Sequence, residues 1–377
     1  RVETVSEPKI LNPGDALVRV RLSSVCGSDL HLLGGYVPTM QAGDIIGHEF
    51  LGEVVEVGGG VQSPKKGDRV IVVSIIGCGH CWFCEHAMWS LCDNSNPNRQ
   101  PQEAIYGKVT AGIFGYSHAF GGYAGSHAEY VRVPYADHTA FKVPNDIPDE
   151  QAVFVSDAAP TGFYAADLCG IRPGDIVAVW GCGGVGQMAI RSAYLLGAER
   201  VIAIDRFADR LAKARERAGA ETLDYTQVSV LDALDEMTGG RGPDACIDAV
   251  GMEADATGVE DVYDRARQYL RLQSDRPHVL RQAFVACRKG GTVSIIGVYG
   301  GLVDKFPIGI AMNKGLTLRM GQQPGQNYVE RLFGHIRRGE LDPSYLLTHR
   351  LPLDDGARGY AMFKRKEDNC LRVVFAP

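Results

Sequence analysis

Apolar and polar positions alternate in short stretches along the first 150 residues. Residues 16–25 (ALVRVRLSSV) and 49–57 (EFLGEVVEV) both show this period of two, and turn signals border them, with Asn12-Pro13-Gly14-Asp15 before the first and Gly58-Gly59-Gly60 after the second. A period of two that is interrupted by frequent turns is typical of antiparallel strands. The pattern therefore predicts a β-rich domain with a barrel-like core.

The pattern changes near residue 175, where an apolar run at 176–180 (IVAVW) precedes a helical stretch. Strands that alternate with helices predict an α/β fold with a doubly wound parallel sheet. At about 100–200 residues per domain, the 377 residues fit two or three domains. The residues after 315 are too few for a third core, so we expect 1–156 with 316–377 to form one domain and 157–315 the other. The further strand-like runs are 201–204, 245–250, 292–297 and 316–320.

A longer stretch, residues 251–288, is helical in pattern and rich in arginine. It fits a solvated helix whose arginine stems lie along its surface. An interface or a lid over a cofactor is the alternative, and the sequence leaves both open.

A glycine motif, G-x-G-x-x-G, follows the strand at 176–180 and begins the next helix. Gly181 would allow the tight turn, Gly183 would let the backbone approach a pyrophosphate, and Gly186 would let helix and strand pack closely. The phosphates would then lie at the helix N-terminus. The loop residues that we assign to a dinucleotide are Gly181, Gly183, Gly184, Val185 and Gly186.

An acidic residue, Asp205, ends the next strand nineteen residues after Gly186. Its carboxylate would accept hydrogen bonds from the adenosine ribose and repel a 2′-phosphate, which favours NAD over NADP. Arg206 follows directly and could instead accommodate that phosphate. The position of Asp205 favours dinucleotide binding over a glycine turn needed only for packing.

Four cysteines, Cys78, Cys81, Cys84 and Cys92, have the spacing C-x2-C-x2-C-x7-C. This spacing predicts four thiolates around one Zn²⁺. A redox-active C-x2-C motif and an iron–sulfur cluster are the alternatives. Because a four-cysteine site has no open coordination position, we expect this metal to be structural.

Three further residues, Cys26, His48 and Asp157, are the candidates for a catalytic metal. A cysteine, a histidine and a carboxylate supply three ligands and leave the fourth position for water or substrate, as in catalytic zinc. Each residue also has an ordinary structural interpretation: a buried thiol, a core histidine and a helix N-cap. The residues alone leave both interpretations open.

Five motifs in this order resemble the zinc-containing medium-chain alcohol dehydrogenases over nearly the whole chain: CGSDLH, GHEFLGEVVEVG, GDRV, the four-cysteine loop and GCGGVG. The resemblance implies a GroES-like catalytic domain with an inserted Rossmann domain. It also implies a catalytic zinc on Cys26, His48 and a third ligand, with Glu49 close behind the metal. Many members have cysteine as the third ligand, where this chain has Asp157. With GGYAGSHAEYVRVPYAD, this makes the chain similar to the glutathione-independent formaldehyde dehydrogenase and formaldehyde dismutase branch.

The resemblance also implies a mechanism. Ser28 would take the hydroxyl proton and pass it through the nicotinamide ribose to His31 and solvent, while hydride leaves for NAD. Asp29 is expected to orient His48 from outside the metal site. Both alcohols and hydrated aldehydes could react there. The remaining cofactor contacts that we expect are Thr161, Arg210, Val298 and Arg372.

The net charge of −6 argues against nucleic acid or an anionic membrane as a partner. No apolar run approaches the length of about 20 residues that spans a bilayer, and no secretory segment opens the chain. We therefore expect a cytoplasmic homodimer or homotetramer that acts on a small alcohol or aldehyde. One alternative enzyme is a formaldehyde dehydrogenase or dismutase that retains NAD. A zinc-ribbon binding protein with a nucleotide-sensing Rossmann domain is the alternative of another class.

Overall fold

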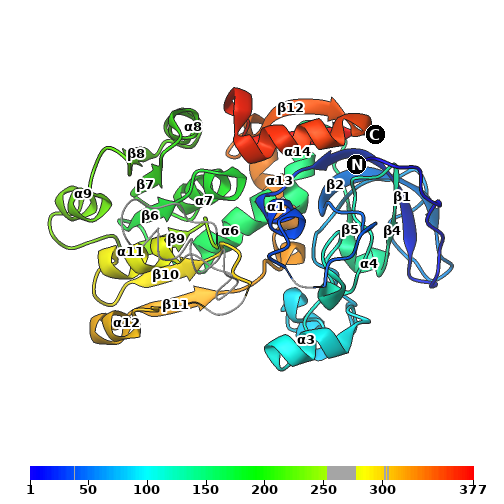
Figure 1. Ribbon diagram of the computed structural model, residues 1–377, viewed down its shortest axis with the longest axis horizontal. Coiled ribbons are helices and arrows are strands. Elements are labelled where there is room, and N and C mark those ends of the chain that lie inside the picture. Colours follow the sequence, from blue (N-terminus) through cyan, green and yellow to red (C-terminus); the bar gives the residue numbers. More distant parts are fainter. Residues whose placement is uncertain (38, 253–276, 301–302, 304) are drawn as a thin grey trace. The chain divides into compact units, whose positions relative to one another are not determined.

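The computed structural model describes residues 1–37, 39–252, 277–300, 303 and 305–377 (Figure 1). The chain divides into two compact units, residues 1–160 with 323–377 and residues 161–322. Most of the arginine-rich stretch at 251–288, namely residues 253–276, lies outside the described residues. Within the described ranges, no helix combines the length and the apolar character that crossing a bilayer requires.

The first unit is built on a seven-stranded sheet with the order β12-β13-β1-β2-β3-β5, in which β4 also pairs with β1. Its strand pairs are antiparallel except for β12 and β13. The β-rich prediction for this part of the chain is therefore confirmed. The strands are β1 (Ala16–Ser24), β2 (Glu49–Val57), β3 (Arg69–Val72), β4 (Tyr130–Val133), β5 (Ala140–Lys142), β12 (Leu347–Pro352) and β13 (Arg372–Ala376).

Buried and exposed side chains alternate along β1, and the buried ones belong to the core of this unit. Val18 and Val20 are buried in a cluster with Phe50 of β2, whereas Arg19 and Arg21 between and after them face outward. The period of two read from the sequence is thus the alternation between core and surface.

Short helices fill the connections: α1 (Gly27–Leu33), α2 (Trp82–Glu85), α3 (Arg99–Tyr106), α4 (Ala136–Thr139), α5 (Asp149–Ala152), α13 (Val329–Arg337), α14 (Gly356–Arg365), and the 3-10 turns η1 (Trp89–Leu91), η2 (His118–Phe120), η3 (Val153–Ser156), η4 (Gly325–Asn327), η5 (Pro343–Leu346), η6 (Leu353–Asp355) and η7 (Glu367–Asn369).

The second unit contains a six-stranded sheet with the order β11-β10-β9-β6-β7-β8. Every strand pair in it is parallel, which confirms the predicted doubly wound sheet. The strands are β6 (Ile176–Trp180), β7 (Arg200–Asp205), β8 (Glu221–Asp224), β9 (Ala245–Asp248), β10 (Thr292–Ile295) and β11 (Thr317–Met320). The helices are α6 (Ala158–Asp167), which spans the division between the units, α7 (Gly184–Leu195), α8 (Ala208–Ala218), α9 (Val230–Met237), α11 (His278–Ala286) and α12 (Ile308–Lys314).

Both faces of this sheet are covered by helices. Val177 and Val179 of β6 pack with residues of α7 and α8, whereas Ile176, Ala178 and Trp180 pack with residues of α9 and α11. This explains why the strand is a continuous apolar run. The strand order reverses between β6 and β9, and ligands of doubly wound sheets bind at such a switch point.

Candidate zinc sites and cofactor loop

Four cysteines converge in the loop that follows β3. The Sγ atoms of Cys78 and Cys84 lie 3.9 Å apart, as do those of Cys81 and Cys92. All four sulfurs lie within 4.8 Å of one another. Four sulfurs bonded to one Zn²⁺ at about 2.3 Å lie about 3.8 Å apart along the edges of a tetrahedron. The four buried thiols therefore fit a zinc ion.

The thiols of this cluster differ in how readily they ionise. Burial raises the pKa of Cys78 and of Cys84. Burial opposes ionisation of Cys81 too, but backbone hydrogen bonds from Cys84 and Asp93 lower the pKa of Cys81 to about 7. Four thiolates in one buried space repel one another unless a cation lies between them. The donor set thus suits a metal held by protein ligands alone.

Cys26, His48 and Asp157 meet in a second buried cluster. The Oδ2 atom of Asp157 lies 3.6 Å from Nε2 of His48 and 3.7 Å from Sγ of Cys26. Tetrahedral zinc with nitrogen and oxygen ligands at about 2.1 Å and sulfur at about 2.3 Å gives ligand separations of about 3.4–3.6 Å. The three donor atoms therefore fit one Zn²⁺ and leave a fourth position open.

Asp29 on α1 contacts the His48 ring. One of its carboxylate oxygens lies 3.1 Å from Nδ1 of His48, and the other accepts the Cys26 amide at 2.8 Å. Burial alone would raise the pKa of Asp29, but the charge and the hydrogen bond of His48 lower it. Burial likewise opposes a charged ring, yet the Asp29 carboxylate raises the pKa of His48 well above its usual range. With Nδ1 turned to Asp29, Nε2 is left for the metal.

The carboxylate of Asp157 is held from its other side. Ser74 donates its hydroxyl to Oδ1 of Asp157 at 3.0 Å, and Gln323 donates its amide to the Ser74 hydroxyl at 2.9 Å. Oδ2 therefore remains directed at Cys26 and His48. All of these side chains are buried, so the bonds are shielded from water.

Ser28 and Tyr116 border the same cluster. The Oγ atom of Ser28 lies 3.4 Å from Nε2 of His48, and the Tyr116 ring packs edge-on against His48 with centroids 5.7 Å apart. Burial raises the pKa of Tyr116 to about 12, so its phenol stays protonated at neutral pH. His31 follows Ser28 by three positions on α1, which places both buried residues on one side of the helix.

Glu49 and Arg372 form a buried pair next to this cluster. Glu49 Oε1 accepts the Ala158 amide at 2.8 Å, and Oε2 lies 3.7 Å from Nη1 of Arg372. The same Nη1 donates to the carbonyl of Val25 at 2.6 Å. Burial raises the pKa of Glu49, while the Glu49 carboxylate outweighs burial and raises the pKa of Arg372. The guanidinium of Arg372 thus faces Glu49 and the carbonyl of Val25. The contact that we expect between Arg372 and the pyrophosphate stays a prediction.

The glycine loop has the backbone geometry for which glycine is needed. Gly181 has φ +90°, and a Cβ atom there would lie 2.8 Å from Cγ2 of Val250. A Cβ on Gly186 would overlap the Gly181 carbonyl. Gly183 is the N-cap of α7, and a Cβ atom there would meet only Nη1 of Arg210, at an ordinary contact distance of 3.8 Å. The chain can therefore turn sharply and leave the N-terminus of α7 exposed to a ligand.

Asp205 and two arginines lie beside this loop. Asp205 Oδ2 accepts the Cys182 amide at 2.7 Å, and Oδ1 accepts the amide of Arg206 at 2.6 Å. The guanidinium groups of Arg206 and Arg210 lie 4.8 and 5.0 Å from the centroid of the Phe207 ring. Of the other expected contacts, Thr161 lies on α6, and the Val298 carbonyl accepts the Met252 amide at 2.9 Å.

Comparison with known proteins gives the family. Residues 12–145 match the model of the alcohol dehydrogenase GroES-like domain, and residues 184–267 match that of zinc-binding dehydrogenase. An uncharacterized zinc-type alcohol dehydrogenase-like protein of Bacillus subtilis, AdhB, is 41% identical in an alignment 379 residues long that covers 100% of this chain and 97% of that protein. The chain belongs to the zinc-containing medium-chain alcohol dehydrogenase family.

Two further relatives of this alcohol dehydrogenase have narrower names. The glutathione-independent formaldehyde dehydrogenase of Pseudomonas aeruginosa is 32% identical over 389 residues, covering 96% of this chain and 91% of that protein. The solved structure of alcohol dehydrogenase TADH from Thermus sp. ATN1 has a TM-score of 0.83 and 34% identity, covering 100% of this chain and 96% of that one. The predicted family, α/β fold class and NAD-dependent zinc alcohol dehydrogenase are confirmed.

Sequence reasoning missed two residues that this dehydrogenase places around its catalytic cluster. Ser74 hydrogen-bonds to Asp157 and Gln323 hydrogen-bonds to Ser74, but no motif marks either residue. The polar Ser74 directly after the apolar run of β3 was the one available signal. The roles assigned to Ser28, His31 and Glu49 stay predictions.

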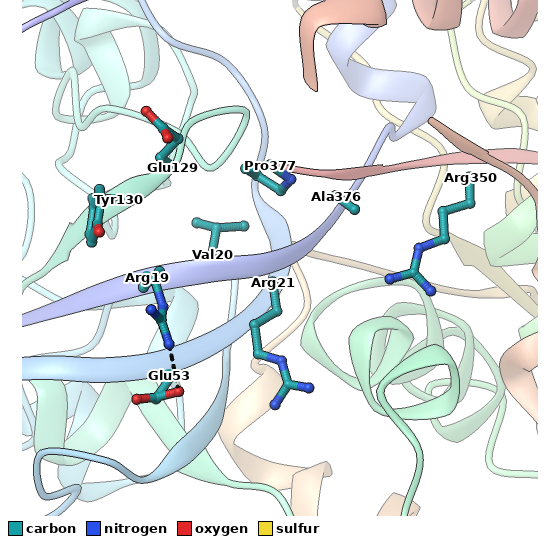
Figure 2. A pocket seen from close by; sticks show the side chains of 9 residues that line it. All are labelled: Arg19, Val20, Arg21, Glu53, Glu129, Tyr130, Arg350, Ala376 and Pro377. Atoms are coloured by element: carbon teal, nitrogen blue, oxygen red, sulfur yellow. Dashed lines mark hydrogen bonds and ion pairs between the residues drawn. The ribbon is translucent and has the colours of Figure 1, made fainter. Parts of the chain in front are cut away.

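A surface groove of about 640 Å³ lies elsewhere on the first unit of the dehydrogenase. Figure 2 shows its three arginines, with Arg19 directed at Glu53. Arg19 pairs with Glu53 at 2.9 Å, Arg21 with Asp149 at 2.9 Å and Arg350 with a glutamate at 3.1 Å. None of the predicted site residues lines this groove, and its cations are already paired, so we assign it no chemistry.

Proposed function

We propose that this dehydrogenase oxidises small alcohols, and aldehydes as their hydrates, with NAD as an exchangeable hydride acceptor. The observation that carries the proposal is the cluster of Cys26, His48 and Asp157, which leaves a fourth coordination position for a substrate oxygen. Bound there, Zn²⁺ supplies Lewis acidity that polarises the oxygen and lowers the pKa of the hydroxyl. A hydrated aldehyde presents the same hydroxyl group, so one site serves both substrates.

Ser28 takes the hydroxyl proton in this proposal. Its Oγ atom lies 3.4 Å from Nε2 of His48, at the edge of the cluster. His31, one helical turn on, would receive that proton and release it to solvent. The Glu49 carboxylate accepts a hydrogen bond from the backbone amide of Ala158. It thereby positions the segment that carries Asp157.

The cofactor rests on the glycine loop in this proposal. The N-terminus of α7, which begins after the N-cap Gly183, receives the pyrophosphate. The carboxylate of Asp205 accepts hydrogen bonds from the ribose hydroxyls and repels a 2′-phosphate, which supports NAD over NADP. The nicotinamide supplies the hydride chemistry, and the chain holds it in place. Thr161, Arg210, Val298 and Arg372 complete the proposed contacts.

We further propose that the dehydrogenase is a homodimer or homotetramer. On the second unit, α12 and the edge strand β11 expose large apolar side chains, among them Met312, Ile308 and Met320, which are 81%, 61% and 58% exposed. An edge strand also has backbone groups open to pairing with another chain. A second copy that covers these residues would remove both the apolar surface and the open edge from water.

A cytoplasmic location is also part of the proposal. No disulfide joins any of the ten cysteines, all of which lie in the described residues. Reduced thiols persist in the cytosol and suit two zinc sites that need five of them.

A substrate panel tests the proposal. Primary alcohols, secondary alcohols, polyols and formaldehyde are each incubated with NAD or NADP, and reduced nicotinamide is followed at about 340 nm. We expect turnover with added NAD that Cys26→Ala abolishes and that the matched thiol control Cys169→Ala retains. No reduced nicotinamide with any substrate would overturn the proposal.

Two alternatives give different results in the same assays. A formaldehyde dismutase retains its nucleotide through gel filtration and needs no added NAD. In a zinc-ribbon binding protein, replacement of Cys26 by alanine leaves all turnover unchanged. Either result would replace the proposed function.

A further inference from the structure

A short segment, residues 323–327, begins the C-terminal part of the first unit. It consists of Gln323, Pro324 and the turn η4 (Gly325–Asn327). The ring of Pro324 fixes its φ, and the Asn327 amide donates to the Pro324 carbonyl at 3.0 Å. The Tyr328 amide donates to the Gly325 carbonyl at 2.9 Å. The segment is therefore locally rigid, so a displacement at one end also moves the other.

Asn327, at one end of the segment, contacts the four-cysteine loop with both atoms of its side-chain amide. Its Oδ1 accepts Nε1–H of Trp89 at 2.9 Å, and its Nδ2 donates to the carbonyl of Ala87 at 2.9 Å. Ala87 and Trp89 lie between Cys84 and Cys92, two of the four cysteines of the cluster. Asn327 therefore connects the segment to the part of the chain that a structural zinc would order.

Gln326 fixes the segment to the start of the same loop. Its Nε2 donates to the carbonyl of Ile75 at 2.9 Å. A Cβ atom on Gly77 would lie 2.6 Å from Cε3 of Trp89 and 3.4 Å from Nε2 of Gln326. The bare Cα of Gly77, directly before Cys78, is thus packed between the Trp89 ring and the segment.

Gln323, at the other end, reaches the catalytic cluster through Ser74. Its Nε2 donates to the Ser74 hydroxyl at 2.9 Å, and Ser74 donates to Oδ1 of Asp157 at 3.0 Å. All three side chains are buried. A carboxylate that binds a metal only accepts hydrogen bonds, and a serine hydroxyl has one hydrogen. Ser74 must therefore give its hydrogen to Asp157 and can only accept from Gln323.

This requirement fixes the orientation of the Gln323 amide. Within the described residues, Oε1 of Gln323 is buried and has no hydrogen-bond partner. Oε1 lies over Gly325, where a Cβ atom would be only 2.7 Å away from it. Leaving a buried carbonyl oxygen unpaired is unfavourable. The bond to Ser74 is thus the side-chain hydrogen bond that accounts for the placement of Gln323.

We propose that the 323–327 segment couples the two metal sites of the first unit. Gln323 is a positioning residue, because it directs the Ser74 hydroxyl at Oδ1 of Asp157 and so keeps Oδ2 toward the other ligands. Asn327 fixes the position of Gln323 by attaching the segment to the four-cysteine loop. The inference rests on the proposed function only in placing a zinc ion at the catalytic cluster.

Release of zinc tests the proposal without relying on turnover. The zinc-loaded full chain is mixed with an excess of the colorimetric chelator 4-(2-pyridylazo)resorcinol, and the coloured zinc complex is followed with time. Cys26→Ala, which removes a ligand of the catalytic cluster, and Cys84→Ser, which removes one of the four-cysteine cluster, assign the two phases of release.

Variants at Ser74 and Gln323 test the positioning role. Partners of a metal ligand contribute about 10–100-fold to metal affinity or activity, so Ser74→Ala should release the catalytic zinc about 10-fold faster. Gln323→Met is one bond more distant, and we expect about 3- to 10-fold. Both should lower kcat and leave KM for NAD unchanged. Gln151→Met removes an amide that donates to Asp342 at 3.1 Å, and this matched control should release both zinc ions like wild type.

An exchange of donor for acceptor separates positioning from packing. Gln323→Glu keeps the length of the side chain, but its carboxylate accepts the Ser74 hydrogen and takes it away from Asp157. We expect catalytic zinc to leave Gln323→Glu at least as fast as it leaves Gln323→Met. Release at the rate of Gln151→Met in Ser74→Ala, Gln323→Met and Gln323→Glu would overturn the positioning role.

Asn327 tests the coupling, because its side chain is exposed and bonds only to the four-cysteine loop. Asn327→Ala should release the catalytic zinc about 3-fold faster and should add no acceleration in the Gln323→Met background. Asn327→Asp, which keeps the acceptor for Trp89, should show a smaller effect in the same direction. An effect of Asn327→Ala on the four-cysteine zinc alone, or an equal effect in both backgrounds, would overturn the coupling. A wild type that holds both zinc ions but oxidises no alcohol would overturn the proposed function instead.

Discussion

Nη1 of Arg372 lies 3.7 Å from Oε2 of Glu49, and both side chains are buried. The pair joins β13 at the C-terminal end of the chain to β2, directly after the metal ligand His48. Removing one partner of a buried ion pair leaves an uncompensated charge, which costs about 3–5 kcal/mol.

Arg372→Met should therefore lower the free energy of unfolding by about 3–5 kcal/mol, as measured by urea denaturation of the zinc-loaded protein. The double variant Glu49→Gln with Arg372→Met removes the stranded charge and should recover part of that loss. If the double variant is as unstable as the sum of the two single variants, the two side chains do not interact.

The four-cysteine loop should depend on its metal. Cys84→Ser removes one of four sulfurs, so we expect one zinc per chain to be lost and the thermal midpoint to fall, because metal binding and folding of such a loop are coupled. Zinc analysis and a thermal melt measure both effects. Cys287→Ser, a buried thiol of the second unit outside both clusters, should retain both zinc ions. Full zinc content in Cys84→Ser would contradict the assignment.

Asp244 gives the second unit an acid-dependent part of its stability. Burial alone would raise the pKa of Asp244, but the Ile176 amide at 2.9 Å and the guanidinium of Arg288 at 2.6 Å lower it. The unfolded chain therefore binds more protons at low pH. The stabilisation is complete above the unfolded pKa of about 3.9 and is lost as pH falls through the lower folded value.

Asp244→Asn should consequently lose about 1–3 kcal/mol at pH 7 and show a flatter decline of stability below about pH 4. Urea unfolding at a series of pH values measures both. Glu236→Gln, an exposed carboxylate on α9, is the control and should follow wild type at every pH. A parallel decline in Asp244→Asn and wild type would refute the linkage.

The parts of this fold that the sequence predicted are those set by near neighbours along the chain. Regular spacing marked the four cysteines and the glycine loop, and continuous apolar runs marked the central strands. The edge strand β8 (Glu221–Asp224) was missed, because its residues are only partly buried and show no apolar run. Asp29 could be expected beside His48, but the hydrogen bond from Gln323 to Ser74 joins residues 249 positions apart, and local pattern carries no information about such a contact.

The exposed apolar residues of α12 and β11 are where we expect the interface of the proposed oligomer. Met312→Lys combined with Ile308→Lys places two charges on that surface, and burying an unpaired charge is costly. We expect analytical ultracentrifugation to show dissociation toward monomers. Leu33→Lys, which alters a 59% exposed residue of the first unit, should keep the wild-type mass. A double variant that sediments like wild type would place the interface elsewhere.

The carboxylate of Asp205 should decide between NAD and NADP. Asp205→Asn keeps an amide oxygen that can accept the Cys182 N–H, which Asp205 now accepts at 2.7 Å, but removes the negative charge. Because like charges brought together cost several kcal/mol, the ratio of kcat/KM for NADP to that for NAD should rise at least about 100-fold. Arg206 and Arg210, both held over Phe207, are then available to the 2′-phosphate. Asp209→Asn removes one negative charge from the nearby start of α8 and should leave the ratio unchanged. The control changes the net charge equally, so a ratio that rises only in Asp205→Asn would show that the effect is local to the ribose site. An unchanged ratio in Asp205→Asn would show that Asp205 does not face the ribose.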